Sequence, residues 1–401
     1  MSNFEPKTIC ILGRQPALGV AELESIYGSD NIKPIKNAAL LNIPADKINF
    51  KNLGGTIKVA RILSELNYSD WQKLTKYLVD TIPAHLEHLP EGKFTLGLSV
   101  YGINVNASQI NRSALQIKKV IKKTRRPVRV VPNKTETLNS AQVLHNKLTH
   151  KGAWELLFIA NGSKTLLAQT MFVQDIEAYA ARDQARPKRD PKIGMLPPKL
   201  AQIIINLAVS RLPADVSASR VRILDPFCGT GVILQEALLM GYSVLGTDID
   251  RRMVEYAKTN MQWLAERQPA ATGHVSIELG DAADSHWARF TTVASEAYLG
   301  RPFAKLPPED MLKQNIHTAN KTIKDFLQNL SAQIKQDRVF CLAIPAWRKP
   351  NGELIHLPVL DKLTDMGYNK VKFKHVRNED LIYYRENQIV ARELLILNKV
   401  K

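Results

Sequence analysis

The chain has 401 residues, enough for two or three domains with ample cores. Its 55 Lys and Arg against 38 Asp and Glu give a net charge of +17. This excess favours a polyanionic partner, and nucleic acid before a membrane. It has no apolar run of membrane-spanning length, and its first residues lack the charged head and apolar core of a secretion signal, so we predict no membrane partner and no leader. The three cysteines are too few and too scattered for a disulfide framework or a zinc cluster, so we predict no metal site and a cytoplasmic protein.

The first 68 residues show the pattern of a small α+β domain, which we predict to be ferredoxin-like. Strands are predicted at residues 8–12 and 39–43, and a short helix at residues 21–27. The glycine pair at residues 54–55 is followed by apolar residues that we interpret as a second helix, through residue 63. This region carries no obvious chemistry, so we predict a spacer or packing domain.

Residues 69–176 form a second predicted domain of mixed helices and strands. Apolar and β-branched runs predict the strands, and apolar residues at helical spacing predict the helices. The predicted strands are residues 94–101, 129–132, 154–160 and 165–170, and the predicted helices are residues 109–123 and 140–148.

One stretch of this second domain is strongly basic. Between Arg112 and Lys147 there are ten basic residues and a single acid, Glu136. A solvated helix face usually mixes both charges, whereas a basic stretch suits a phosphate backbone, which releases its counterions on binding. We therefore predict a nucleic-acid contact, the basic patch, made by Lys118, Lys119, Lys122, Lys123, Arg125, Arg126 and Arg129.

A basic connection follows, and we predict a linker over residues 177–194. Prolines at positions 187, 191, 197 and 198 prevent the stretch from Tyr179 to Leu200 from forming one helix. A third domain is predicted over residues 195–401, and its first helix over residues 201–212.

The third domain contains a glycine turn between a strand and a helix. Strand residues 221–224 precede the run D-P-F-C-G-T-G at residues 225–231, and a helix follows at residues 232–240. Glycines in such a turn let a nucleotide-like ligand approach the backbone at the carboxyl end of the strands. A second strand ends at Asp248, which is placed to accept hydrogen bonds from ribose hydroxyls.

This turn differs from two common nucleotide-binding motifs. The third glycine of the dinucleotide fingerprint is replaced by Leu234, and no Gly-Lys-Ser/Thr follows as in a P-loop. The run instead resembles motif I of the class I S-adenosylmethionine-dependent methyltransferases. That resemblance implies a Rossmann-like α/β domain with a mostly parallel, doubly wound sheet and an antiparallel C-terminal hairpin.

The resemblance also implies the cofactor, S-adenosylmethionine, and the residues that bind it. Asp225 and the backbone of Gly229 and Gly231 would hold the methionine part, with Phe227 in the same motif. Asp248 would bind the ribose. Asp281, after the predicted strand at residues 275–279, would accept from the adenine amino group.

Three further stretches extend the resemblance over nearly the whole chain. Residues 138–143 and 173–176 resemble a THUMP domain, the RNA-binding module of several tRNA-modifying enzymes. R-P-x-R-D at residues 186–190 and G-M-L-P-P-K-L-A at residues 194–201 resemble the entry to the catalytic domain of THUMP-containing tRNA guanine-N2 methyltransferases of the guanosine-10 type, where it lies over the cofactor. Residues 381–385 and 390–397 resemble the closing hairpin of that fold.

The sequence departs from this family at the motif that handles the base. Amino methyltransferases carry Asp/Asn-Pro-Pro-Tyr/Phe after the fourth strand, to stack the flipped base and accept from its N–H groups. Here the stretch has Ser295 in place of the amide or carboxylate, no proline, and Tyr298 as the predicted stacking residue. We predict that the site is altered but working, and that Glu296, one position later, accepts from the N–H groups of the base together with main-chain carbonyls. The alternative is that Glu296 is a surface residue on a degraded motif.

We therefore predict a tRNA methyltransferase that forms N2-methylguanosine, at position 10 by resemblance. The alternatives are a ribosomal RNA guanine-N2 methyltransferase and a non-catalytic RNA-binding protein that retains the cofactor fold. The sequence leaves open the target nucleotide, transfer of one or two methyl groups, the oligomeric state and the presence of a small activator protein subunit.

Overall fold

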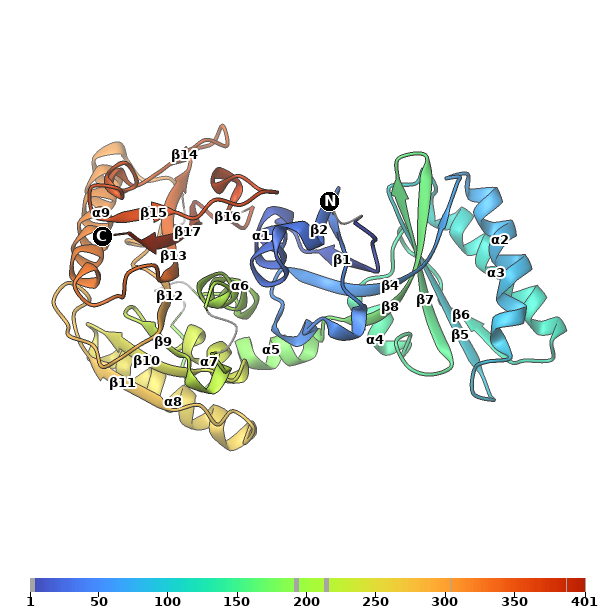
Figure 1. The fold of residues 1–401 in the computed structure, drawn as a ribbon, viewed down its shortest axis with the longest axis horizontal. Coiled ribbons are helices and arrows are strands. Elements are labelled where there is room, and N and C mark those ends of the chain that lie inside the picture. The colour runs from blue at the N-terminus through green and yellow to red at the C-terminus, as the bar shows by residue number, and fades with distance from the viewer. Residues whose placement is uncertain (1–3, 191–194, 213–215, 304, 387, 401) are drawn as a thin grey trace. The chain divides into compact units, whose positions relative to one another are not determined.

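The computed structural model describes residues 4–190, 195–212, 216–303, 305–386 and 388–400. Two compact units account for the chain, and Figure 1 shows both. Unit 1 comprises residues 1–13, 30–51 and 56–178, and unit 2 comprises residues 14–29, 52–55 and 179–401. The end of the predicted linker, residues 191–194, lies outside the described residues.

Unit 1 is built on one eight-stranded sheet. The strand order is β2-β3-β1-β4-β8-β7-β5-β6, with β5 parallel to both β7 and β6 and the other pairs antiparallel. This sheet joins the strands of both predicted N-terminal domains, because β4 pairs with β8. The strands are β1 (Thr8–Leu12), β2 (Ile32–Ile35), β3 (Ala38–Leu41), β4 (Thr56–Leu66), β5 (Phe94–Tyr101), β6 (Val128–Val130), β7 (Ala153–Asn161) and β8 (Lys164–Val173).

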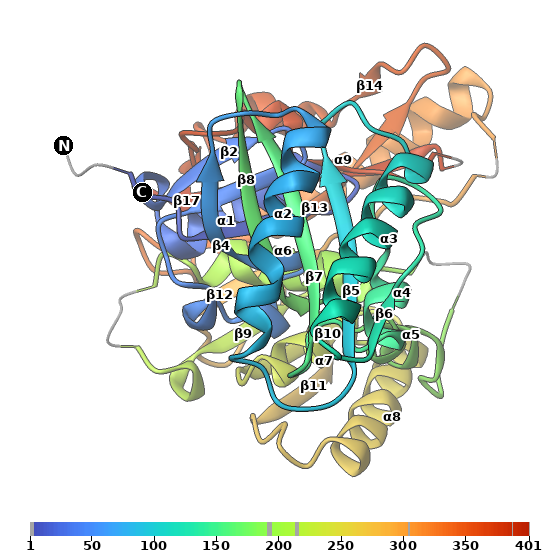
Figure 2. The same cartoon turned by 90° about the vertical axis from the view of Figure 1, so that its right-hand side faces the viewer.

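Helices α2 (Trp71–Leu86) and α3 (Ala107–Lys123) cover one face of this sheet, side by side in Figure 2. Their apolar residues, among them Leu78 and Ile117, share a core with Phe94 and Phe158 of the strands. Helix α3 begins with a capping box between Asn106 and Gln109, in which each side chain accepts from the other residue's backbone N–H. A short helix, α4 (Ser140–His145), completes the unit.

The predicted helix after the glycine pair at residues 54–55 is wrong, because residues 56–66 form strand β4. Thr56, Ile57, Val59 and Ile62 are β-branched, a residue type that fits a pleated surface better than a helix. The glycines serve close packing instead. A Cβ on Gly55 would lie 2.5 Å from the Cα of Gly19, so only glycine fits there.

Gly19 belongs to α1 (Pro16–Tyr27), which is part of unit 2 although the chain on either side of it belongs to unit 1. The buried carboxylate of Glu22 accepts from the backbone N–H groups of Gly54 and Gly55, at 2.9 and 2.8 Å, and from Asn206 at 2.7 Å. This division differs from the predicted first domain of residues 1–68. A buried carboxylate needs several donors, and these come from distant parts of the chain.

Unit 2 contains a nine-stranded sheet with the main order β11-β10-β9-β12-β13-β17-β15. The strands from β11 to β13 are parallel, and β17 is antiparallel to its neighbours. The strands are β9 (Arg222–Asp225), β10 (Ser243–Asp248), β11 (Val275–Leu279), β12 (Thr292–Glu296), β13 (Val339–Arg348), β14 (Leu354–Ile355), β15 (Tyr368–Lys370), β16 (Ile382–Tyr383) and β17 (Val390–Lys399).

Helices cover both faces of this sheet, as expected for a doubly wound fold. Alternate residues of one strand face opposite cores, so Ile223 packs with the helices of one face and Leu224 with those of the other. The first face carries α6 (Pro198–Val209), α7 (Val232–Leu239) and α8 (Arg251–Arg267), and the second carries α9 (Glu309–Ser331), opposite α6 in Figure 1.

The predicted elements around the glycine turn are confirmed, and the start of the helix before them is corrected. Helix α5 (Ile176–Gln184) occupies the first part of the predicted linker and ends before Pro187. Helix α6 begins at Pro198, three residues earlier than predicted, since proline has no N–H to lose at the first helical position. Of the helices in the described ranges, none combines the length and the apolar character needed to cross a bilayer.

Candidate active site

The glycine turn lies where the strand order of unit 2 reverses. The chain runs from β9 outward to β10 and β11, then returns to place β12 on the other side of β9. In open α/β sheets a crevice forms at such a point, beyond the carboxyl ends of the strands. Gly229 and Gly231 have φ of +49° and +85°, a region that side chains disfavour. The glycines therefore allow the chain to turn sharply at the edge of this crevice.

Asp248 fixes the turn from the end of β10. One carboxylate oxygen accepts from the backbone N–H of Gly229 at 2.8 Å, and the other accepts from Asp250 at 2.9 Å. Burial raises the pKa of Asp248, and the two backbone hydrogen bonds oppose that shift. Asp250 in turn caps α8 by accepting from the N–H of Arg252. The predicted cofactor residues Gly229 and Asp248 are thus brought into direct contact.

Asp225 ends β9 and is almost fully buried, with 2% of its surface exposed. Its carboxylate accepts from the Ser295 hydroxyl at 2.5 Å and from the Phe227 N–H at 3.4 Å. Burial raises the pKa of Asp225 to about 7, and the charges of Asp248 and Glu296 add to that rise. Three carboxylates therefore influence one another at the switch point of the sheet.

Two aromatic contacts connect the turn to α9. The ring of Phe227 meets Phe326 edge-on with centroids 5.3 Å apart, and Trp287 also contacts Phe326. The indole N–H of Trp287 donates to the Thr247 hydroxyl at 3.1 Å, next to Asp248. Sequence analysis missed Trp287, although it follows the predicted adenine-binding residue Asp281 by only six positions.

Asp281 lies at the neighbouring strand end. It is exposed, and its carboxylate accepts from the N–H of Ala283 at 2.9 Å. The N–H of the preceding Gly280 donates to the carbonyl of Asp248 at 3.0 Å. The loop that carries Asp281 is therefore tied to the strand end that carries Asp248.

The altered motif begins at the end of β12. Ser295 is fully buried and directs its hydroxyl to Asp225, so it supports the turn instead of facing a ligand. Glu296 is only partly buried, and its carboxylate forms an ion pair with Arg392 of β17. Sequence analysis missed Arg392, because it lies 96 positions from Glu296 and no local pattern links the two residues.

Tyr298 lies in the loop after β12 with 38% of its surface exposed. Together with Phe303, Arg301 and Met311 it lines a small pocket against the first turns of α9. Asn315 holds this loop, because its side-chain oxygen accepts from the N–H of Arg301 at 2.8 Å. The pocket therefore has an aromatic and partly apolar lining beside the end of β12.

The connection before α6 packs against the glycine turn. Arg186 is buried and donates to the Thr230 hydroxyl at 3.2 Å. Asn260 of α8 donates to the carbonyls of Thr230 and Lys188 at 2.8 and 2.9 Å and accepts from the Lys188 N–H at 3.0 Å. Sequence analysis missed the part that Asn260 plays, which ties three segments together.

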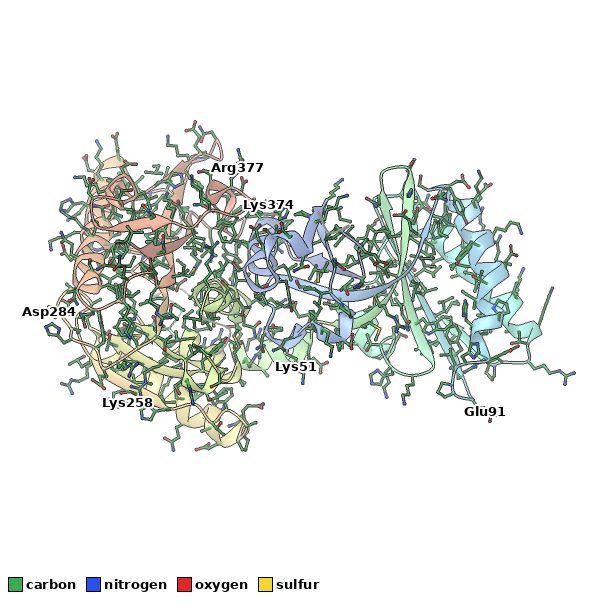
Figure 3. All side chains as sticks on the ribbon, viewed as in Figure 1. Lys51, Glu91, Lys258, Asp284, Lys374 and Arg377 are labelled. Atoms are coloured by element: carbon green, nitrogen blue, oxygen red, sulfur yellow. The ribbon has the colours of Figure 1, made fainter. Side chains whose placement is uncertain are left out.

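The basic patch lies in unit 1, on the C-terminal half of α3 and the residues after it. Lys119, Lys122, Lys123, Arg125 and Arg129 are exposed, and Lys118 and Arg126 are partly buried. Arg126 has a structural use, since its guanidinium donates to the carbonyls of Leu86 and Pro90. Glu91, labelled in Figure 3, marks the loop that Arg126 holds.

Within the described ranges, no group of three or more His, Cys, Asp or Glu is arranged to hold a metal ion. The three cysteines are buried, and none of them forms a disulfide.

Comparison with known families and structures points to the same region. Residues 186–286 match the family described as UPF0020, RMKL-like, methyltransferase domain. A stretch of 82 residues is 51% identical to the tRNA (guanine(10)-N2)-dimethyltransferase of Methanothermobacter thermautotrophicus, covering 20% of this chain and 22% of that protein. The protein of the same name from Pyrococcus abyssi is 37% identical over 108 residues, 27% of this chain and 26% of its own length. The matched regions thus span about a quarter of the length of these relatives.

The crystal structure of TrmN from Thermus thermophilus aligns with 99% of this chain and 100% of its own, with a TM-score of 0.53 and 16% sequence identity. At that identity the likeness concerns the fold. Unit 2 therefore has the reversed strand order and the glycine turn of a doubly wound nucleotide-binding fold, and its residues 186–286 are similar to a methyltransferase-domain family.

Proposed function

We propose that this protein is an S-adenosylmethionine-dependent tRNA methyltransferase that acts on the exocyclic N2 of a guanosine, at position 10. The observation that carries the proposal is the contact between the Gly229 N–H and Asp248 at the switch point of a methyltransferase domain. The substrate is suggested by the archaeal relatives, which are named tRNA (guanine(10)-N2)-dimethyltransferases. Whether one or two methyl groups are added is an outcome of the experiment below.

The residues at the switch point fit this cofactor. A Cβ built on Gly229 would meet no atom closer than the Phe227 carbonyl at 4.0 Å, so the turn faces open space. Burial raises the pKa of Asp225, and the negative charges of Asp248 and Glu296 add to that rise. A ligand that carries a sulfonium and an ammonium group would relieve that charge. When bound, S-adenosylmethionine would supply an electrophilic methyl group.

Each residue predicted to bind the cofactor has a definite task in this proposal. Asp225 and the backbone of the glycine turn hold the amino-acid end of the cofactor, and Asp248 accepts from the ribose. Asp281, on the loop tied to Asp248, accepts from the adenine. Phe227 packs the turn against α9.

The guanine base must leave its stack to reach this site. Tyr298, which is exposed beside Phe303, stacks the flipped base. Glu296 accepts from its N–H groups, which stabilises the positive charge that develops on nitrogen during transfer. Ser295 contributes by holding Asp225.

The basic patch supplies the contact with RNA. Its five exposed members can each approach a phosphate, whereas Lys118 and Arg126 are partly buried. We assign residues 69–176 as the THUMP domain and this patch as its surface for tRNA.

A second candidate is a non-catalytic RNA-binding protein that retains the cofactor fold. One observation favours it, namely that the Glu296 carboxylate is already paired with Arg392 while Ser295 is buried. Such a protein would bind cofactor and RNA without transferring a methyl group.

The deciding experiment is mass spectrometry of nucleosides from purified tRNA and ribosomal RNA of cells with and without the gene. We expect N2-methylguanosine or its dimethylated form to disappear from tRNA and to return when the wild-type gene is restored. Loss from ribosomal RNA would favour that substrate instead. Unchanged nucleosides in both RNAs would favour the binding protein.

A further inference from the structure

Arg392 is a buried arginine at the active edge of the sheet that no motif predicted. Only 4% of its surface is exposed, and its guanidinium Nε–H donates to Oε1 of Glu296. We propose that Arg392 is a positioning residue, which holds the Glu296 carboxylate in the orientation that receives the amine of the target base. This inference rests on the proposed function.

The strand register explains how two residues far apart in sequence meet. Glu296 of β12 is paired with Ala343 of β13, and Arg392 of β17 is paired with Pro345 of the same strand. Paired residues share a face of the sheet, and so do residues two apart on one strand. Glu296 and Arg392 therefore project from one face on either side of β13, and the small Ala343 leaves room for the contact.

The local charge explains why the carboxylate needs a cation. Glu296 shares the switch point with Asp225, whose pKa its charge helps to raise. Without a counter-charge, repulsion would favour a rotamer of Glu296 directed toward solvent, away from the other carboxylates. Arg392 opposes this repulsion, and the ring of Tyr383 on β16 lies 6.0 Å from its guanidinium.

The form of the contact leaves part of the carboxylate for substrate. Arg392 donates through Nε to Oε1, and among the described residues no hydrogen bond reaches Oε2 of Glu296. A carboxylate oxygen can accept from an N–H of the base while its partner oxygen is held. The pair thus offers a fixed acceptor at the end of β12.

A buried ion pair could also serve stability alone, because removal of one partner leaves the other charge uncompensated. The two roles differ in how the effects of substitutions combine. If Arg392 acts through Glu296, its removal costs nothing further once Glu296 has been replaced. A stabilising role would instead lower the unfolding temperature without this coupling in the rate.

The test is a double-mutant cycle on single-turnover methyl transfer to unmodified tRNA at saturating cofactor and RNA. The variants are Glu296→Gln, Arg392→Gln and the double substitution, with Arg392→Lys as a conservative variant that keeps the charge. Arg348→Gln is the matched control, since Arg348 ends β13 but stacks on Tyr384 and, among the described residues, donates to the backbone carbonyls of Arg385 and Glu386. Cofactor affinity and unfolding temperature are measured for each.

We expect Arg392→Gln to slow transfer by about 10²-fold, the double variant to be no slower than Glu296→Gln alone, and Arg392→Lys to recover part of the rate. Arg348→Gln should stay near the wild-type rate. Losses that multiply in the double variant, or a rate for Arg392→Gln within a few-fold of wild type, would overturn the inference. If Arg392→Gln does not fold, Arg392→Lys with and without Glu296→Gln completes the same cycle.

Failure of the inference and failure of the proposed function give different results. A wild-type protein that binds cofactor and tRNA yet transfers nothing contradicts the proposed function. An active wild type whose two substitutions act independently contradicts only the role of Arg392.

Discussion

The candidate site of unit 2 and the basic patch of unit 1 hold their charged groups in opposite ways. In unit 2, Asp225, Asp248 and Glu296 are buried or partly buried, and each has a defined hydrogen-bond or ion-pair partner. In unit 1, Lys119, Lys122 and other members of the basic patch are exposed on α3 and the chain after it. Pre-organised groups contribute large individual effects, whereas exposed charges contribute small effects that accumulate. Substitutions should therefore act very differently in the candidate site and in the basic patch.

The largest expected effect is that of Glu296→Gln on the chemical step. The substitution keeps an acceptor oxygen but removes the charge that stabilises the developing cation. Loss of one pre-organised electrostatic interaction is typically worth about 3–4 kcal/mol, so we expect single-turnover transfer to fall by about 10²–10³-fold. Calorimetric affinity for S-adenosylmethionine should fall far less than the rate, because the glycine turn is untouched. A full rate in this variant would show that another group accepts the hydrogen bond from the amine N–H of the base.

The next effect concerns cofactor affinity. Asp248→Ala removes the acceptor for the Gly229 N–H and, in the proposed function, for the ribose. Hydrogen bonds to a charged group are worth about 1.5–3 kcal/mol, so binding should weaken by about tenfold or more in calorimetry. Asp250→Ala removes the neighbouring cap of α8 and is the matched control, with an effect mainly on stability. Equal cofactor affinity in Asp248→Ala and wild type would contradict the assignment.

A smaller effect is expected on the pH dependence of stability. The pKa of Asp225 is about 7 in the folded protein, above its ordinary value of 3.8. Between these values the folded state binds more protons than the unfolded state, so the free energy of unfolding falls as pH rises from about 4 to 7. Asp225→Asn should make this slope shallower in urea titrations of the cofactor-free protein. Some pH dependence should remain in Asp225→Asn, because burial also raises the pKa of Glu22 to about 7.

The smallest effect per residue belongs to the basic patch. Each lost phosphate contact lowers the slope of log affinity against log salt by about 0.7–0.9. Lys122→Ala alone should change the slope by less than one, and replacement of Lys122, Lys123 and Arg125 together by about two to three. Arg126 is left out, because it holds Leu86 and Pro90. Filter-binding of tRNA at several salt concentrations gives the slopes, and an unchanged slope in the triple variant would exclude this surface.

The difference between the units also explains what the sequence could predict. The contact of Gly229 with Asp248 follows from local spacing, since the turn and the next strand place both groups by backbone geometry. The pair of Glu296 and Arg392 spans 96 positions and depends on the register of three strands, so no local pattern contains it. The error at β4 has a related cause. The two glycines before it do not start a helix, because Gly54 packs closely against α6 and Gly55 against α1.

The discontinuous course of unit 2 has a consequence for how this protein can be divided. Helix α1 and residues 52–55 belong to unit 2 although more than a hundred residues of unit 1 follow them in the chain. A fragment that begins at the linker would lack the Glu22 carboxylate that accepts from Asn206 and would expose the apolar face of α6 that Leu18 covers. During synthesis, unit 2 therefore completes its fold with segments that left the ribosome before residues 56–178 of unit 1. Exchange of domains between related genes would have to carry these N-terminal segments along with the C-terminal half.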